Sequence, residues 1–342
     1  MTDDAPTEQP AATVGRGDVI DAERIAANPH ARRLGRMANH PASIPWAGWK
    51  QVLRRTVNEV ITDRVSLSAA GCAFYATLAL FPAISMLVSI YGLVFDPATV
   101  EPQLATLRDL LPPSAFELIS NRVHQLVSKP GGALTFSLVI STVLALWSSA
   151  TGTKAILGAL NLAYEERERR NFIRYQLTAF GITLGGIVAA VIGLSALVLL
   201  PVITKFLYLS AYAAWLTRVA SLLALMAFVP LALSLLYRFG PSRRHASWRW
   251  ITPGSAIATV IWVLASVLFS AYVEHVASYD ATYGPLGAVI GIMMWFYVTA
   301  FVVLFGAELN AELELQTICD STEGGPRPIG ARGAYVADHV AR

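Results

Sequence analysis

The stretch IGIMMWFYVTAFVVLFGAEL, residues 290–309, contains a single charged residue, Glu308. The stretch IATVIWVLASVLFSAYVEHV, residues 257–276, is almost as apolar. An α-helix rises about 1.5 Å per residue, so about twenty apolar residues span the ~30 Å hydrocarbon core of a bilayer. Neither stretch alternates at period two, as a strand of a membrane barrel would. Both therefore predict membrane-spanning helices.

The composition extends this prediction to the whole chain. Of 342 residues 55% are hydrophobic and 14% are charged, and the mean hydropathy is +0.52, whereas about a quarter of a soluble domain is charged. Six apolar blocks are long enough to span a bilayer: 67–95, 133–157, 176–203, 212–237, 251–275 and 284–310. The predicted fold class is all-α, a polytopic bundle of six transmembrane helices that forms one domain over residues 45–320.

The positive charges predict the orientation, because Lys and Arg concentrate in cytosolic segments. Twenty of the 26 lie in the two terminal regions and in the 2–3 and 4–5 loops, whereas four lie in the segments on the other side. The remaining two, Lys154 and Arg218, lie near predicted helix ends. Both termini are therefore expected in the cytosol, and an even number of spans independently requires them to lie on the same side. The first apolar block begins too late and is too long for a cleavable signal peptide.

The segments outside the blocks have their own patterns. Residues 1–44 and 321–342 show no sustained period and are predicted to be disordered cytosolic tails. From Trp46 onward, apolar residues recur at three- and four-residue steps, which predicts a helix lying in the headgroup layer or, alternatively, packed on the cytosolic loops. The external 1–2 loop, 96–132, is predicted to be helical and to act as a lid or simply to pack on the bundle.

Two further patterns concern helix surfaces. The run EERERR, residues 165–170, predicts a solvated helix extension with the pairs Glu165–Arg169 and Glu166–Arg170 at i,i+4. Small residues three or four positions apart predict close helix packing. They are Gly181 and Gly185 in the third block and Gly284, Gly287 and Gly291 around the start of the sixth.

The sequence shows no pattern of a catalytic or metal site. It contains no HExxH, no Cys/His cluster with metal spacing, no Walker loop and no GxSxG. Ionisable residues are essentially missing from the middle of the blocks, and Glu308 falls near the cytosolic end of the sixth. We therefore expect no catalytic residue, no metal and no cofactor, and the pattern does not support a pump with a buried carboxylate relay.

Two short segments supply the candidate binding residues. In PSRRHASWRW, residues 241–250, the side chains of Arg243, Arg244 and Arg249 could capture anionic lipid headgroups, or could simply follow the positive-inside rule beside interfacial Trp residues. In YDATY, residues 279–283, Tyr279, Asp280 and Tyr283 lie in a predicted external turn between the last two helices. That turn is structural, or it contacts a substrate or a cation.

Together with LSAAGCAFYATLALFP (67–82), the segment YDATYGPLGAVIGIMMWFYVTAFVVLFGAELNAELE (279–314) resembles the YihY/BrkB family of bacterial inner-membrane proteins. Two positions depart from the family pattern, Asp280 where Asn is usual and Pro285 where Ser is common. The resemblance implies a multi-pass protein of the bacterial inner membrane with cytosolic ends. The family carries a ribonuclease label and a virulence label, and its members have been linked to movement of lipids or lipopolysaccharide precursors.

The function expected from these observations is transport or translocation of an amphipathic lipid or envelope precursor. The alternative is a non-transporting envelope scaffold or assembly partner, and a membrane-bound hydrolase or ribonuclease is the third reading. The expected partners are membrane lipids, including anionic ones, and no nucleic acid. A homo-oligomer and a complex with envelope proteins both stay open.

Overall fold

The computed structural model describes residues 25, 27–94, 147, 150–186, 188, 211–275 and 286–341. Within these residues the chain is helical and forms no strand, apart from one isolated bridge between Ala246 and Thr322. The all-α prediction is therefore confirmed. The external 1–2 loop and the turn 279–283 lie outside the described residues, as do large parts of the second and third predicted spans, so the count of six spans stays a prediction.

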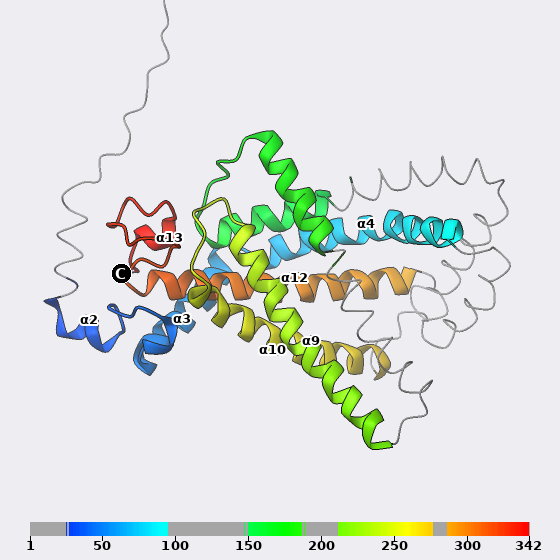
Figure 1. The fold of residues 1–342 in the computed structure, drawn as a ribbon, viewed down its shortest axis with the longest axis horizontal. Coiled ribbons are helices and arrows are strands. Elements are labelled where there is room, and N and C mark those ends of the chain that lie inside the picture. Colours follow the sequence, from blue (N-terminus) through cyan, green and yellow to red (C-terminus); the bar gives the residue numbers. More distant parts are fainter. Residues whose placement is uncertain are drawn as a thin grey trace, which may run out of the picture.

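The bundle is arranged around the helix α12 (Leu286–Leu315). Helix α4 (Val65–Val94) lies along one side of α12, and α10 (Trp248–His275) packs on another side. Helix α9 (Ala211–Phe239) packs on α10 and crosses it in Figure 1. These four helices agree to within a few residues with predicted apolar blocks, except that α12 continues five residues beyond its block.

Short elements collect at the C-terminal end of α12, which we call the polar end. They are α2 (Pro29–Arg33), the 3-10 turn η1 (Pro41–Ser43), α3 (Trp46–Thr62) and α13 (Tyr335–Asp338). Figure 1 shows α2, α3 and α13 gathered there, on the left, while the apolar parts of α4 and α12 extend away from them.

The long helices expose apolar side chains outward. Residues Trp248–Val273 and Val289–Leu315 each form a helix long and apolar enough to cross a bilayer, and few side chains in the most apolar part of each helix are buried inside the protein. More than half of the surface is exposed for several large side chains of α10: Val260, Leu264, Val267 and Leu268. A contiguous apolar surface of this kind marks a membrane or protein contact in a folded protein.

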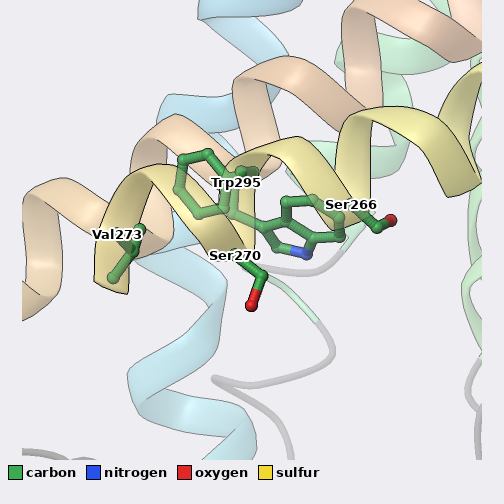
Figure 2. A pocket seen from close by; sticks show the side chains of 5 residues that line it. Ser266, Ser270, Val273 and Trp295 are labelled. Atoms are coloured by element: carbon green, nitrogen blue, oxygen red, sulfur yellow. The ribbon is translucent and has the colours of Figure 1, made fainter. Parts of the chain in front are cut away.

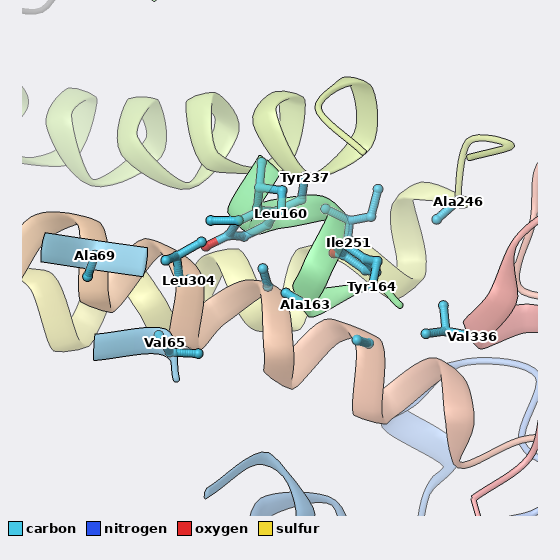
Figure 3. Close-up of a cluster of buried hydrophobic side chains, with 13 residues drawn as sticks. Val65, Ala69, Leu160, Ala163, Tyr164, Tyr237, Ala246, Ile251, Leu304 and Val336 are labelled. Atoms are coloured by element: carbon cyan, nitrogen blue, oxygen red, sulfur yellow. The ribbon is translucent and has the colours of Figure 1, made fainter. Parts of the chain in front are cut away.

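The buried core connects the helices near the polar end. Figure 3 shows Leu160, Tyr237, Ile251 and Leu304 among the side chains of this cluster, which come from segments far apart in the sequence. The Tyr237 hydroxyl donates a hydrogen bond to the Val303 carbonyl at 2.7 Å, so its polar tip is satisfied inside the apolar cluster.

Helices α10 and α12 approach most closely at two glycines. A Cβ on Gly254 would lie 2.3 Å from the Gly306 carbonyl oxygen, and a Cβ on Gly306 would lie 2.4 Å from the Tyr237 hydroxyl. The backbone N–H of Gly254 donates to Asn310 Oδ1 at 2.8 Å. By contrast, a Cβ on Gly181, Gly185 or Gly291, which the sequence pattern singled out, would meet no heavy atom within 4 Å. The small-residue contact is real but lies at other positions.

A buried ion pair stabilises the polar end. Arg243 donates two hydrogen bonds, of 2.6 and 3.1 Å, to the carboxylate of Glu314, and both side chains are 0% exposed. The Ser321 hydroxyl also donates to Glu314, and the guanidinium lies 4.2 Å from the centre of the Tyr164 ring. Burial alone would lower the pKa of Arg243, but the Glu314 carboxylate raises it above its ordinary value, so the pair stays charged.

The prediction of disordered tails is wrong for residues 29–44 and 321–341. The Asp338 carboxylate accepts hydrogen bonds from the backbone N–H groups of Gly330, Arg332 and Gly333, which folds the C-terminal segment onto itself. The N-terminal segment is joined to the end of α12 by a hydrogen bond of 2.8 Å from the Thr317 hydroxyl to the Ala38 carbonyl. The missing period misled the prediction, because polar contacts rather than an apolar stripe order these segments.

The predicted helix extension at 165–170 is also wrong. The preceding helix ends at residue 163, and Glu165 has a φ of +55°, in the left-handed region that ends a helix. Glu168 instead pairs with Arg170 at 2.8 Å, and the Glu166 carboxylate accepts the backbone N–H of Tyr335 at 2.6 Å. The acidic residues therefore connect loops rather than support a helix.

Helix α3 begins at Trp46, where the predicted helical pattern also begins, and packs on α12 with one face. Val52 and Thr56 are fully buried, and Arg55 forms an ion pair with Glu312. That face therefore packs on the long helix α12, whereas the alternative prediction named the cytosolic loops as its partner. The other face leaves large apolar side chains exposed: Trp46, Val57 and Ile61. Contact of this face with the headgroup layer stays a prediction.

Gly306→Ala is expected to destabilise the protein by about 1–3 kcal/mol, because its methyl group would overlap the Tyr237 hydroxyl and the Ala258 methyl group. Thermal unfolding of the full chain in detergent measures the change. Gly291→Ala, in the same helix but with open space around it, is the matched control and should be neutral or slightly stabilising. Equal melting temperatures for the two variants would contradict the close approach.

Arg243→Met is expected to cost roughly 3–5 kcal/mol of stability, because it leaves the Glu314 carboxylate buried without its cation. Adding Glu314→Leu to this variant should recover most of the loss. Arg249→Met, at an exposed arginine six residues further on, should change stability by less than about 0.5 kcal/mol. Equal melting temperatures for Arg243→Met and Arg249→Met in the same thermal assay would show that the ion pair contributes little to stability.

Candidate functional site

A cavity of about 490 Å³ opens on the surface of α10 and α12, at the end of the bundle opposite the polar end. Its lining residues are Ser266, Phe269, Ser270, Val273 and Trp295. Figure 2 shows Ser266, Ser270 and Val273 along one stretch of α10 with Trp295 beside them. The volume falls within the range of small-molecule sites, which are mostly apolar with a few polar groups.

Aromatic contacts fix the walls of this cavity. The ring of Trp295 on α12 lies 5.4 Å from that of Phe269 and 5.9 Å from that of Trp262, both on α10. The Trp262 indole donates to the Thr299 hydroxyl at 3.3 Å, and the Ser266 hydroxyl donates to the Trp262 carbonyl at 2.7 Å. The cavity is therefore built from rigid rings on two packed helices and presents hydroxyl oxygens beside an apolar surface.

The structure does not gather the three predicted arginines into one exposed site. Arg243 is committed to Glu314 inside the protein, so it could contact a headgroup only by breaking that ion pair. Arg244 is half-buried and donates to the Glu323 carbonyl, while Arg249 is exposed near the start of α10. The other three predicted site residues, Tyr279, Asp280 and Tyr283, lie outside the described residues.

A second candidate site, which we call the acidic corner, is polar. It lies where the end of α3 and the start of α4 meet α12. Its carboxyl groups are Glu59, Asp63, Glu165, Glu308 and Glu312. Glu308 is 2% exposed, and its Oε1 is buried without a hydrogen-bond partner in the described part of the chain. The sequence placed Glu308 correctly near a helix end, but it gave no sign that α3 and the segment after residue 163 would bring further carboxyl groups beside it.

The electrostatics of the corner follow from burial. Desolvation, together with the neighbouring Glu165 and Glu59 carboxylates, raises the pKa of Asp63 to about 6. Desolvation likewise raises the pKa of Glu166, against the opposing effects of the Tyr335 N–H and Arg169. Among the described residues no group of three or more His, Cys, Asp or Glu side chains is arranged to hold a metal ion.

Comparison with known proteins identifies the kind of chain that carries these features. A family model described as Virulence factor BrkB matches residues 56–328. A Bacillus subtilis (strain 168) protein named ribonuclease-like protein YfkH is 33% identical over 259 residues, which cover 72% of this chain and 88% of that protein. No solved structure matches the chain.

Two further relatives carry the name UPF0761 membrane protein. The one from Aliivibrio fischeri (strain ATCC 700601 / ES114) is 26% identical over 274 residues, which are 78% of this chain and 84% of the relative. The one from Paraburkholderia xenovorans (strain LB400) is 27% identical over 257 residues, which are 73% of this chain and 57% of the relative. The apolar helices described above agree with these names. Because the family match extends over most of its 342 residues, the protein belongs to the Virulence factor BrkB family and is a membrane protein.

Proposed function

We propose that this protein binds an amphipathic membrane lipid and moves it between the two leaflets of the bilayer. The observation that carries the proposal is the cavity beside Trp295, which opens on helices that are long and apolar enough to span a bilayer. A cavity with aromatic and aliphatic walls favours an acyl chain, because burial of each CH₂ group contributes about 0.8 kcal/mol. The hydroxyls of Ser266 and Ser270 supply hydrogen-bonding groups for the polar part of such a molecule.

The length of α10 supports a lipid as the ligand. Arg249 and Ser270 are twenty-one residues apart on this helix, which corresponds to about 32 Å. A basic residue at one end and a cavity near the other therefore fit the two surfaces of a bilayer. Arg249 is exposed and Arg244 half-exposed, so these two arginines are the headgroup contacts that we propose at the polar end.

The same charges support an orientation within the bacterial inner membrane. The polar end holds the basic loops 165–174 and 238–249 and both described ends of the chain. Cytosolic segments of membrane proteins are enriched in Lys and Arg. We propose that the polar end faces the cytosol and that the cavity beside Trp295 opens in the outer half of the bilayer.

One relative has ribonuclease-like in its name, so nuclease activity is a second candidate. Hydrolysis of a phosphodiester in a metal-dependent enzyme uses a cluster of metal ligands, and the described residues supply none with suitable geometry. To test for nuclease activity, the same purified protein is incubated with labelled RNA alongside each functional assay. Sequence-independent cleavage that follows the protein through purification would favour the nuclease reading, and a scaffold would be favoured if neither activity appeared.

Ser270→Trp is expected to slow lipid translocation about tenfold or more, a loss of at least ~1.4 kcal/mol of transition-state stabilisation, because the indole would fill the cavity. The assay follows a fluorescent lipid in vesicles of phosphatidylethanolamine and phosphatidylglycerol, with an impermeant reductant outside. Leu264→Trp, exposed on the same helix but outside the cavity, is the matched control and should retain the wild-type rate.

Two results would overturn the proposal. Wild-type vesicles that translocate no lipid faster than empty vesicles would remove the activity, provided that the reconstituted protein melts normally. Equal rates for Ser270→Trp and Leu264→Trp would remove the cavity as its site.

The orientation predicts which thiol a membrane-impermeant maleimide reaches. The chain has two cysteines, of which Cys72 is buried and Cys319, after α12 at the polar end, is half-exposed. In a Cys72→Ala background, Cys319 should stay unlabelled in intact spheroplasts and become labelled after permeabilisation. Ser43→Cys, at an exposed position of the same end, provides a second probe. Labelling of either thiol in intact spheroplasts would show that the polar end faces away from the cytosol and would contradict the proposed orientation.

A further inference from the structure

The acidic corner contains one buried carboxyl group, that of Glu308, for which the described residues supply no partner to its Oε1. Three glutamates lie on the last two turns of α12, at positions 308, 312 and 314. Glu312 pairs with Arg55 and Glu314 pairs with Arg243. Glu308 is 2% exposed, forms no ion pair in the described part of the chain, and its Oε1 has no hydrogen-bond partner there. Two of the three buried carboxylates on α12 are therefore neutralised by arginine, whereas Glu308 has no arginine partner in the described part of the chain.

The groups around Glu308 make its charge more costly, not less. Its electrostatic neighbours are Asp63 and Glu59 at the end of α3, Glu165 after the helix 150–163, and Glu312 on its own helix. The Tyr164 hydroxyl also interacts with it. Arg55, the cation that α3 brings to this region, donates its hydrogen bonds to Glu312 and Gln316.

The remaining neighbours of this part of α12 are apolar or neutral. Helix α4 contacts it through Val65 and Ala69, which belong to the same buried cluster as Leu304, Ala307 and Ala311. Helix α10 approaches it at Gly254, which hydrogen-bonds to Asn310.

A carboxylate in such surroundings is unfavourable by several kcal/mol, because desolvation is not repaid by a cation. The group avoids this cost by binding a proton, in a simple association of H⁺ from water with one carboxylate oxygen. Asp63, at the more exposed rim of the corner, already shows the effect, since its pKa rises to about 6. A metal ion is a poorer fit, because these carboxyl groups lack the arrangement of a metal site.

We propose that Glu308 is a proton-binding site: its side chain is a neutral carboxylic acid at neutral pH and releases the proton when the α3–α4 corner moves away from α12. The chain turns at this corner between the end of α3 at Thr62 and the start of α4 at Val65, where the exposed Arg64 adopts a φ of +51°. A small rotation of α3 about the turn would admit water to Glu308. The site would couple proton binding to the conformation of the polar end, and it stands whether or not the protein moves lipids.

Infrared spectroscopy of the full chain in detergent tests the site directly. At about pH 7.5 the Asp63 carboxyl, with its pKa near 6, is largely ionised. We expect the wild-type protein to show the carbonyl stretch of a protonated carboxylic acid at this pH, and Glu308→Gln to lack it. Glu312→Gln, one turn further along the same helix at a carboxylate paired with Arg55, is the matched control and should keep the band.

Two outcomes would overturn the proposal. A wild-type spectrum without this band at about pH 7.5 would show that Glu308 is ionised, whatever the variants do. A band that persists in full in Glu308→Gln would assign the proton to another group. Since Gln resembles the neutral acid in shape and charge, Glu308→Gln should also melt close to wild type at this pH, and its lipid translocation rate is a separate measurement that bears only on the proposed function.

Discussion

The need to satisfy charged side chains on the last two turns of α12 is the constraint on which the rest of the structure depends. An otherwise apolar helix carries Glu308, Asn310, Glu312 and Glu314 into the protein interior, where an unpaired charge is destabilising by several kcal/mol. The partners come from distant parts of the sequence. Arg55 arrives from α3, and Arg243 arrives from the loop between α9 and α10.

This pairing also explains why segments without apolar periodicity are ordered. Ser321 donates to the same Glu314 carboxylate that binds Arg243, so the start of the C-terminal segment is attached to the ion pair itself. Glu166 then binds the backbone of Tyr335, and Thr317 binds the N-terminal segment at Ala38. One end of the bundle is thus held by hydrogen bonds and ion pairs. The opposite end presents apolar side chains outward, which the membrane environment of this family accommodates.

The two candidate sites lie on the same helix but differ in chemistry: one is an apolar surface and the other is a buried ionisable group. Trp295 and Glu308 are thirteen residues apart on α12, about 20 Å along a continuous helix. The cavity beside Trp295 offers apolar contact to a ligand, whereas Glu308 is an ionisable side chain buried away from water. Both candidate sites are therefore built on one continuous helix.

The sequence alone determined the all-α class and the extents of α4, α9, α10 and α12 to within a few residues, because about twenty consecutive apolar residues permit little other than a membrane-spanning helix. The motifs in residues 67–82 and 279–314 indicated the family. The sequence also placed the basic loops together. Only the tertiary structure decided that Arg243 is buried while Arg249 is exposed, that Gly306 rather than Gly291 is a contact, and that Glu308 pairs with no cation of the described residues. Hydropathy is a property of local windows of the chain, whereas the pairing of buried charges depends on which distant segments meet.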